Sequence, residues 1–176
     1  MITVPLLIAS FLPVALSVCM LWVVVSDASR YIIPNSLNLI LLGLYILALI
    51  FLPMAPPLPA LGAAAIILVI GLGLFSLGLM GGGDIKLLVV LSLWTGWGIA
   101  TLQFIFLTAI SGGLLVFVIL PARVLLPSVW LKLRPGKPLP RLLTKKQPVP
   151  YGIAIAIAFV WLLWTDSIVG LATTAR

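Results

Sequence analysis

Three aspartates are the only acidic residues in this 176-residue sequence, and they are its clearest candidates for chemistry. They are Asp27, Asp84 and Asp166. The sequence contains no histidine, which excludes histidine general bases, histidine metal ligands and Ser-His-Asp triads. Its single cysteine, Cys19, excludes a disulfide framework and a CxxC metal site. We therefore expect carboxylate chemistry that needs no cofactor and no metal ion.

A pair of carboxyl groups can hydrolyse an amide bond without further help. The ionised partner acts as general base on a water molecule, and the protonated partner donates to the carbonyl oxygen. Like charges held close together do not both ionise, so such a pair keeps one proton. Two aspartates that meet in space therefore predict the dyad of an aspartic protease.

The composition predicts that such a pair would lie in a membrane protein. Hydrophobic residues make up 64% of the sequence and charged residues only 7%, whereas soluble domains usually contain about 25% charged residues. The chain lacks the polar side chains that a water-exposed surface requires, so the bilayer must be its solvent. The net charge of +7 does not indicate nucleic-acid binding, because the basic residues lie in loops beside apolar runs.

Six apolar runs predict an all-α, polytopic membrane protein with a single domain over residues 1–176. A span needs roughly 20 residues to cross the hydrocarbon core. The first run has no basic region before it, so we read it as a retained span and not as a signal peptide. The predicted spans cover residues 4–25, 36–52, 60–79, 85–100, 101–120 and 151–164.

The basic residues predict the orientation of these spans. Nine of the ten Lys and Arg residues fall in the loops after the first, third and fifth spans. By the positive-inside rule, these loops face the cytoplasm. Both termini are then expected on the outer side of the inner membrane.

This topology brings two of the three aspartates to one edge of the membrane. Asp27 ends the first span and Asp84 begins the fourth, with one crossing out and one crossing back between them. Asp166 ends the sixth span on the opposite side, roughly 30 Å of hydrocarbon away. The expected dyad is therefore Asp27 with Asp84 at the cytoplasmic edge.

The segment 121–150 is the only long predicted loop. Six prolines between residues 123 and 150 predict that it forms no long helix. Two interpretations remain open. The segment either anchors the chain on anionic lipid or forms a flap over a site on the same side.

Glycines surround the second aspartate, in the run Gly81-Gly82-Gly83-Asp84. Gly81 and Gly83 allow positive φ angles and close approach of a substrate strand. The alternative is a tight turn in which Asp84 caps a helix. A carboxylate near a helix N-terminus is favoured in its ionised form, which predicts Asp84 as the more acidic partner.

Two polar residues near the aspartates have two interpretations each. Lys86 either shifts the pKa of the dyad or contacts the substrate backbone. Alternatively, it is only a cytoplasmic charge that sets the orientation of the spans in the membrane. Asn35 either hydrogen-bonds near the dyad or caps the second span.

Three motifs in this order resemble those of the type IV prepilin peptidases, which are membrane aspartic proteases of the GxGD type. Gly81-Gly82-Gly83-Asp84 matches the GxGD motif and continues into Ile85-Lys86-Leu87-Leu88. Ile33-Pro34-Asn35 ends eight residues after Asp27, and Val149-Pro150-Tyr151-Gly152-Ile153-Ala154 opens the last predicted span. The motifs extend over nearly the whole chain.

The resemblance implies a function and a partner. It implies that Asp27 and Asp84 are catalytic and cleave the basic leader from prepilins or pseudopilins at the cytoplasmic face, before their hydrophobic N-terminal helix. The chain looks like the short, peptidase-only form of Flp (tight-adherence) pilus systems, because it lacks the extra cytoplasmic segment of the bifunctional enzymes. N-methyltransferase activity is therefore not expected. The pilus assembly machinery is a further candidate partner.

Two other classes of function stay open. A small transporter or channel subunit could use the aspartates as a proton or cation site, but such sites lie near the membrane midplane. A non-catalytic scaffold of a pilus or secretion system would be expected to have lost an aspartate.

Overall fold

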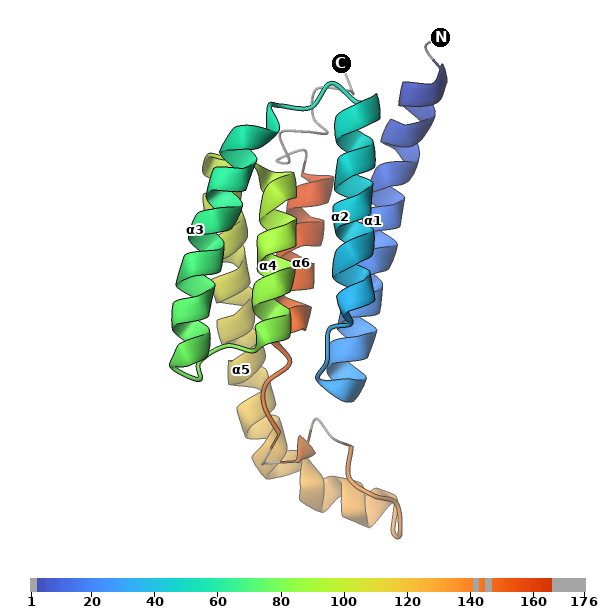
Figure 1. Cartoon of the computed structure of the whole chain (residues 1–176). Helices are drawn as coiled ribbons and strands as arrows, with labels where there is room; N and C mark the ends of the chain where they lie inside the picture. The colour runs from blue at the N-terminus through green and yellow to red at the C-terminus, as the bar shows by residue number, and fades with distance from the viewer. Residues whose placement is uncertain (1–2, 141–142, 145–146, 166–176) are drawn as a thin grey trace.

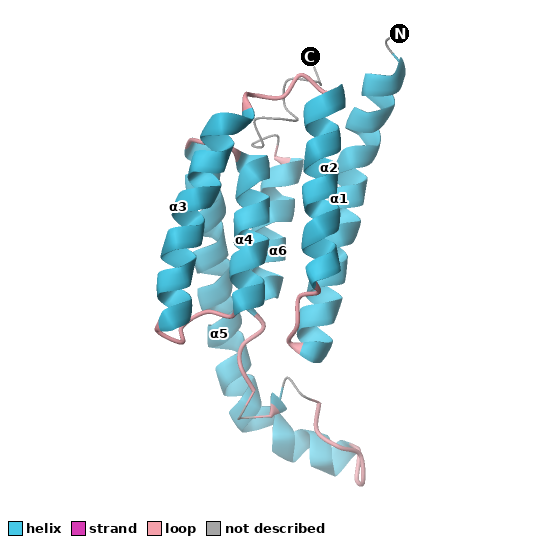
Figure 2. Ribbon diagram, in the orientation of Figure 1, coloured by secondary structure: helices cyan, strands magenta, loops and turns pink. Residues whose placement is uncertain are grey.

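The computed structural model describes residues 3–140, 143–144 and 147–165. Within these residues the chain forms helices and no strand, as Figure 2 shows. This confirms the predicted all-α architecture. The helices are α1 (Thr3–Arg30), α2 (Asn35–Phe51), α3 (Pro57–Ser76), α4 (Gly82–Thr95), α5 (Ile99–Leu133) and α6 (Tyr151–Trp164).

The outer surface of the helices is apolar, as a lipid-facing surface must be. Three helical segments are long and apolar enough to cross a membrane: Ser10–Arg30 of α1, all of α3 and all of α5. Helices α2 and α6 are apolar but shorter. Large hydrophobic side chains such as Phe11, Val69 and Phe117 point outward. In water this surface would aggregate, whereas in a bilayer it matches its solvent.

Helices α4 and α6 form the centre of the bundle. Helix α6 packs against α1, α4 and α5, and α4 also packs against α2, α3 and α5. Figure 1 shows these two short helices between α3 on the left and α2 on the right. Fully buried side chains of α4 and α6, including Leu87, Trp94 and Phe159, build the core between them.

One end of the bundle collects the segments that carry the predicted site. The end of α1, both ends of the α1–α2 connection and the beginnings of α4 and α6 meet there, at the lower end in Figure 1. Both Asp27, near the end of α1, and Asp84, in the first turn of α4, therefore lie at this end. Asp166 lies outside the described residues.

Helix α5 is longer than the sequence predicts. The predicted span ended at residue 120, but the helix continues through Pro121 and Pro127 to Leu133. The expectation that prolines prevent a long helix is wrong for residues 121–133. A proline removes one backbone hydrogen bond and bends a helix without always ending it. Figure 1 shows α5 leaving the bundle and bending in this region.

Two glycines form the turn between α4 and α5. Gly96 has a φ angle of +72° and Gly98 a φ angle of +143°, which side chains with a β-carbon rarely adopt. Helix α4 accordingly ends at Thr95, five residues before the predicted end of the fourth span at residue 100.

Candidate active site

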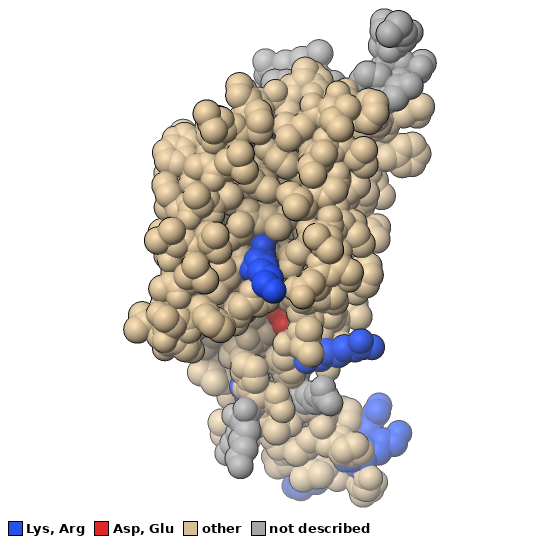
Figure 3. Space-filling model, in the orientation of Figure 1, with Lys and Arg blue, Asp and Glu red and all other residues tan. Residues whose placement is uncertain are grey.

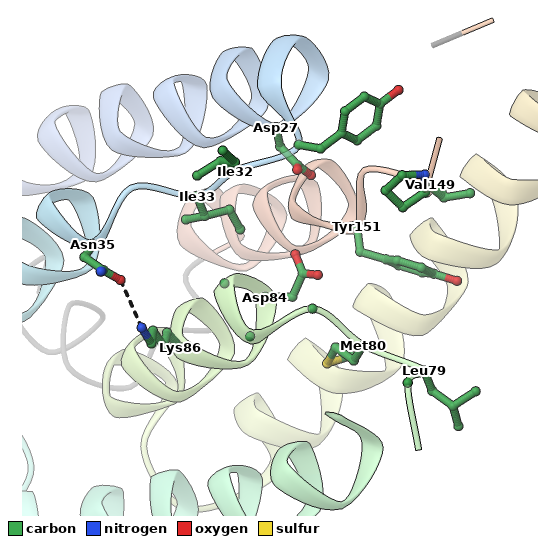
Figure 4. Close-up of a pocket in the computed structure, with 16 residues that line it drawn as sticks. Asp27, Ile32, Ile33, Asn35, Leu79, Met80, Asp84, Lys86, Val149 and Tyr151 are labelled. Carbon is green, nitrogen blue, oxygen red and sulfur yellow. Dashed lines mark hydrogen bonds between the residues drawn. The ribbon is translucent and has the colours of Figure 1, made fainter. Parts of the chain in front are cut away.

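A cavity of about 610 Å³ lies at the lower end of the bundle. Its wall is built by the end of α1, the start of α2, the turn before α4, the start of α4 and the approach to α6 (Figure 4). All six site residues named from the sequence line this one cavity: Asp27, Asn35, Gly81, Gly83, Asp84 and Lys86. Residues up to 59 positions apart in the sequence therefore share one chamber.

Asp27 is held by the N-terminus of α6. Its side chain is 5% exposed, and the backbone N–H groups of Gly152 and Ile153 act on its carboxylate as hydrogen-bond donors. The first amides of a helix carry partial positive charge, so they favour an anion. The Ile153 N–H is shared, since it also donates to the Pro150 carbonyl at 3.3 Å. The Oδ2 atom of Asp27 is buried without a hydrogen bond in the described structure.

Gly152 is glycine because the carboxylate lies against its backbone. A β-carbon on Gly152 would lie 2.7 Å from Oδ2 of Asp27 and 3.0 Å from Cδ1 of Ile33. Atoms do not approach that closely without displacement. The sequence reasoning named Gly152 only as part of a motif and gave it no role.

Asp84 lies in the first turn of α4 and reaches back to the start of its own helix. The N-cap residue is Gly81, so the alternative interpretation, in which Asp84 itself caps the helix, is wrong. Instead the Gly81 backbone N–H donates to the Asp84 carboxylate, the arrangement known from capping boxes. A β-carbon on Gly81 would lie 2.9 Å from Oδ2 of Asp84.

The two carboxyl groups face each other across the cavity. Figure 4 shows the side chain of Asp27 pointing from α1 toward that of Asp84 on α4, and the two groups interact electrostatically. Two carboxyls in such a partly closed site favour a state in which one is ionised and the other protonated. This arrangement can activate a water molecule and donate a proton at the same place.

The glycines of the turn act through their missing side chains and not through positive φ angles. Gly81 has ordinary extended backbone angles, and Gly82 begins the helix. The positive φ angle of this connection, +70°, belongs to Gly78. The missing side chain matters most at Gly81, because a β-carbon on Gly83 would lie 3.4 Å from Cβ of Ile33, which is an ordinary contact.

Lys86 and Asn35 bind each other at the mouth of the cavity. The Nζ atom of Lys86 donates to Oδ1 of Asn35 at 3.1 Å, the dashed line in Figure 4. The N-cap of α2 is Pro34, and no side chain caps that helix, so the capping role predicted for Asn35 is wrong. The hydrogen bond ties the start of α2 to α4. Figure 3 shows an acidic side chain recessed in this face, between basic side chains.

Tyr31 is a further cavity residue that the sequence reasoning missed. It follows α1 directly and has a φ angle of +57°, which is uncommon for a bulky residue and costs energy. The turn is closed by the Ser26 hydroxyl, which donates to the Ile32 carbonyl at 2.6 Å. The Tyr31 hydroxyl is buried without a hydrogen bond in the described structure. No local sequence signal predicts this conformation.

A metal site built from side chains usually has three or more ligands. Among the described residues, no group of three or more His, Cys, Asp or Glu side chains could hold one. The chemistry that these residues offer is that of two carboxyl groups.

Comparison with known families identifies a match for the chain. The model of the type IV leader peptidase family matches residues 14–118, more than half of the 176 residues. The matched region contains both cavity aspartates and the glycine turn, but ends before α6. No curated protein and no solved structure is similar enough to the chain to count as a match.

Proposed function

Because this chain belongs to the type IV leader peptidase family, a family of proteases, we propose that it is a prepilin peptidase of the Flp type. Its substrate is a prepilin or pseudopilin, and its products are the leader peptide and the shortened protein. The observation that carries this proposal is the opposition of Asp27 and Asp84 in one cavity.

Asp27 is the ionised partner and general base in the proposed mechanism. Two backbone N–H groups of α6 donate to it, whereas Asp84 receives one donor. Hydrogen bonds to a carboxylate favour its charged form. This assignment reverses the expectation from sequence, which considered only the helix that begins at Asp84.

The reaction then needs only water and the two carboxyl groups. Asp27 removes a proton from water as the oxygen attacks the scissile carbonyl carbon, and Asp84 donates its proton to the carbonyl oxygen. When the tetrahedral intermediate collapses, the C–N bond breaks, the proton on Asp27 passes to the leaving amine, and Asp84 regains its proton. The products are a leader with a free carboxyl group and a protein with a new amino terminus.

The basic residues support a site at the cytoplasmic face of the inner membrane. Arg30 and Lys86 lie at the cavity end of the bundle, and the lower part of α5 and the segment after it carry Arg123, Lys132, Arg134 and Lys137. Six spans with both termini outside would place this end in the cytoplasm. There the basic leader and the start of a substrate's hydrophobic helix would reach the aspartates. We also propose that the protein has no N-methyltransferase activity.

Cleavage of a prepilin by the purified protein in detergent tests the proposal. Wild type is compared with Asp27→Asn and Asp84→Asn, and the products are identified by mass spectrometry. Asp166→Asn is the matched control, since it makes the same chemical change at the third aspartate. We expect both dyad variants to lose cleavage and the control to retain it. If either dyad variant processes the substrate at nearly the wild-type rate, the dyad assignment is wrong.

A flux assay separates the proposal from the transport alternative. The same protein preparation is reconstituted in liposomes, and proton and sodium flux are measured. A peptidase shows cleavage without aspartate-dependent flux. Flux that Asp27→Asn abolishes, with no cleavage by wild type, would replace the proposal.

A further inference from the structure

Arg123 lies on the part of α5 that extends beyond the bundle, yet its side chain is only 5% exposed. Its Nη1 atom donates to the Gln147 carbonyl at 2.7 Å, and its Nη2 atom donates to the Pro148 carbonyl at 2.8 Å. One guanidinium group therefore holds two successive backbone carbonyls. Charge-assisted hydrogen bonds are stronger than neutral ones, and the planar fork of arginine fixes direction as well as distance.

The segment that Arg123 holds, residues 147–150, is called the strap below. Pro148 and Val149 of the strap line the cavity. Pro148 and Pro150 have no backbone N–H, so these residues offer only their carbonyls as anchoring groups. The Arg123 side chain uses such a group at Pro148.

The strap leads directly to the groups that hold Asp27. Helix α6 begins at Tyr151, immediately after the strap, and its Gly152 and Ile153 amides are the donors to Asp27. A shift of the strap along its own direction therefore shifts both donors relative to the carboxylate. Figure 4 shows Tyr151 near Asp84, with Val149 farther from the two aspartates.

Helix α5 supports this connection at a second point. A β-carbon on Gly112 would lie 3.1 Å from Cε1 of Tyr151, so the tyrosine ring lies flush against the α5 backbone. Tyr151 also lines the cavity. Arg123 and Gly112 thus hold the strap and the start of α6 from the same helix, one on each side of Pro150. The continuation of α5 through Pro121 is what brings Arg123 to the strap.

We propose that Arg123 is a positioning residue for the cleavage reaction, acting through the carbonyls of Gln147 and Pro148. By fixing the strap, it sets where the Gly152 and Ile153 amides meet Asp27 and where the Val149 wall meets the substrate. The role in catalysis rests on the proposed function, whereas the role in fixing the strap does not.

Three variants test the catalytic part. Arg123→Met removes the hydrogen-bond donors but keeps an unbranched side chain. Arg123→Lys keeps the positive charge but lacks the planar fork that donates to both carbonyls. Arg134→Met removes a positive charge from the exposed end of the same helix, where Arg134 stacks 5.1 Å over the Trp130 ring. We expect Arg123→Met to lower kcat on the order of 10- to 100-fold, as misplacement of catalytic groups does. Arg123→Lys should recover part of this loss, and Arg134→Met should match wild type.

A labelling experiment tests the strap without using activity. Gln147→Cys is introduced into a Cys19→Ala background, and its reaction rate with a maleimide is measured with Arg, Lys or Met at position 123. The Gln147 backbone carbonyl is unchanged by this substitution. We expect labelling to be several-fold faster with Met than with Arg, and intermediate with Lys, because an unanchored strap opens more often.

The outcomes separate the two proposals. Loss of kcat with faster labelling supports the positioning role. Loss of kcat with unchanged labelling, or full activity in Arg123→Met, overturns it. If wild type cleaves no prepilin, the proposed function fails, and unchanged labelling in Arg123→Met would then show independently that Arg123 does not hold the strap. If Arg123→Met does not fold, Arg123→Lys is compared with wild type instead. A lower kcat together with faster labelling then supports the positioning role, and either one without the other overturns it.

Discussion

The carboxylate of Asp27 rests on the backbone of Gly152. These residues lie 125 positions apart, on α1 and at the start of α6, and a β-carbon on Gly152 would lie 3.1 Å from the Asp27 carboxyl carbon. The contact places an aspartate from one end of the sequence against the amides of a helix from the other. It explains why the last helix must begin at the cavity and why its second residue lacks a side chain.

Substitution of Gly152 by alanine should therefore damage the site more than the fold. The added methyl group would displace the Asp27 carboxylate or separate α6 from α1. We expect kcat to fall on the order of 100-fold, the cost of misplacing a catalytic group by about 1 Å. The rate of prepilin cleavage by the purified variant measures this effect.

Gly43→Ala is the control for this substitution. A β-carbon on Gly43 would meet nothing within 4 Å, and the residue lies inside α2, where alanine is favoured over glycine. This variant should be as active as wild type and at least as stable in thermal unfolding. Equal activity of Gly152→Ala and Gly43→Ala would contradict the proposed contact of catalytic groups.

Gly81 and Gly82, two of the glycines before Asp84, should differ in their tolerance of alanine. A β-carbon on Gly81 would lie 2.9 Å from the Asp84 carboxylate, whereas one on Gly82 would lie 3.6 Å from the Phe75 ring, an ordinary contact. Gly81→Ala should lower kcat on the order of 10-fold because the carboxylate must rotate away from its position. Gly82→Ala should remain nearly as active as wild type. The opposite ranking in a cleavage assay would show that the turn is restricted by something other than the Asp84 side chain.

The rate of cleavage should fall both at low pH and at high pH. The proposed mechanism needs one ionised and one protonated carboxyl group, so activity is lost when both carry a proton and when neither does. The profile of kcat/KM against pH should therefore be bell-shaped. The two apparent pKa values that this profile gives describe the pair of carboxyl groups and not either aspartate alone. A profile with a single limb would indicate that only one carboxyl group titrates in the catalytic step.

The sequence predicted the aspartate pair because that inference needs only the number of crossings between them. Asp27 and Asp84 are separated by an even number of helices, which returns both to one end of the bundle whatever the packing. The sequence analysis named Asn35 and Lys86 as candidates because they lie near the aspartates in the sequence, and both line the cavity. Their hydrogen bond to each other was not predictable, since it depends on how α2 packs against α4.

Arg123 and Gly152, to which the sequence assigned no role in the site, are placed by tertiary contacts. Arg123 reads as one of many loop charges, because its partners are 24 and 25 residues away. The role of Gly152 depends on the packing of α1 against α6. The sequence did not predict that α5 continues past residue 120. Proline removes a backbone hydrogen bond locally, but the packing of the rest of the helix decides whether the helix ends there.

The proposed orientation makes a prediction about accessibility. In a Cys19→Ala background, Ala55→Cys lies in the connection between α2 and α3, and Lys137→Cys lies in the segment after α5, at the cavity end. A maleimide that does not cross membranes should label position 55 in intact spheroplasts and position 137 only after permeabilisation. The reverse pattern would place the cavity on the outer side and exclude cleavage of a leader in the cytoplasm.

The hydrogen bond between Lys86 and Asn35 makes a prediction about coupling. Lys86→Met and Asn35→Leu each remove one partner of a bond between two exposed side chains, so the free energy involved is about 0.5–1.5 kcal/mol. If this bond positions α4 against α2 at the cavity, either variant lowers kcat/KM about 2- to 10-fold, and the double variant loses no more than the worse single variant. A double-mutant cycle on kcat/KM measures this. If the losses simply add, Lys86 acts on the substrate or the dyad independently of Asn35. If Lys86→Met loses nothing in detergent and only misorients in the membrane, the residue is a topology charge, and the hydrogen bond is a consequence of its position.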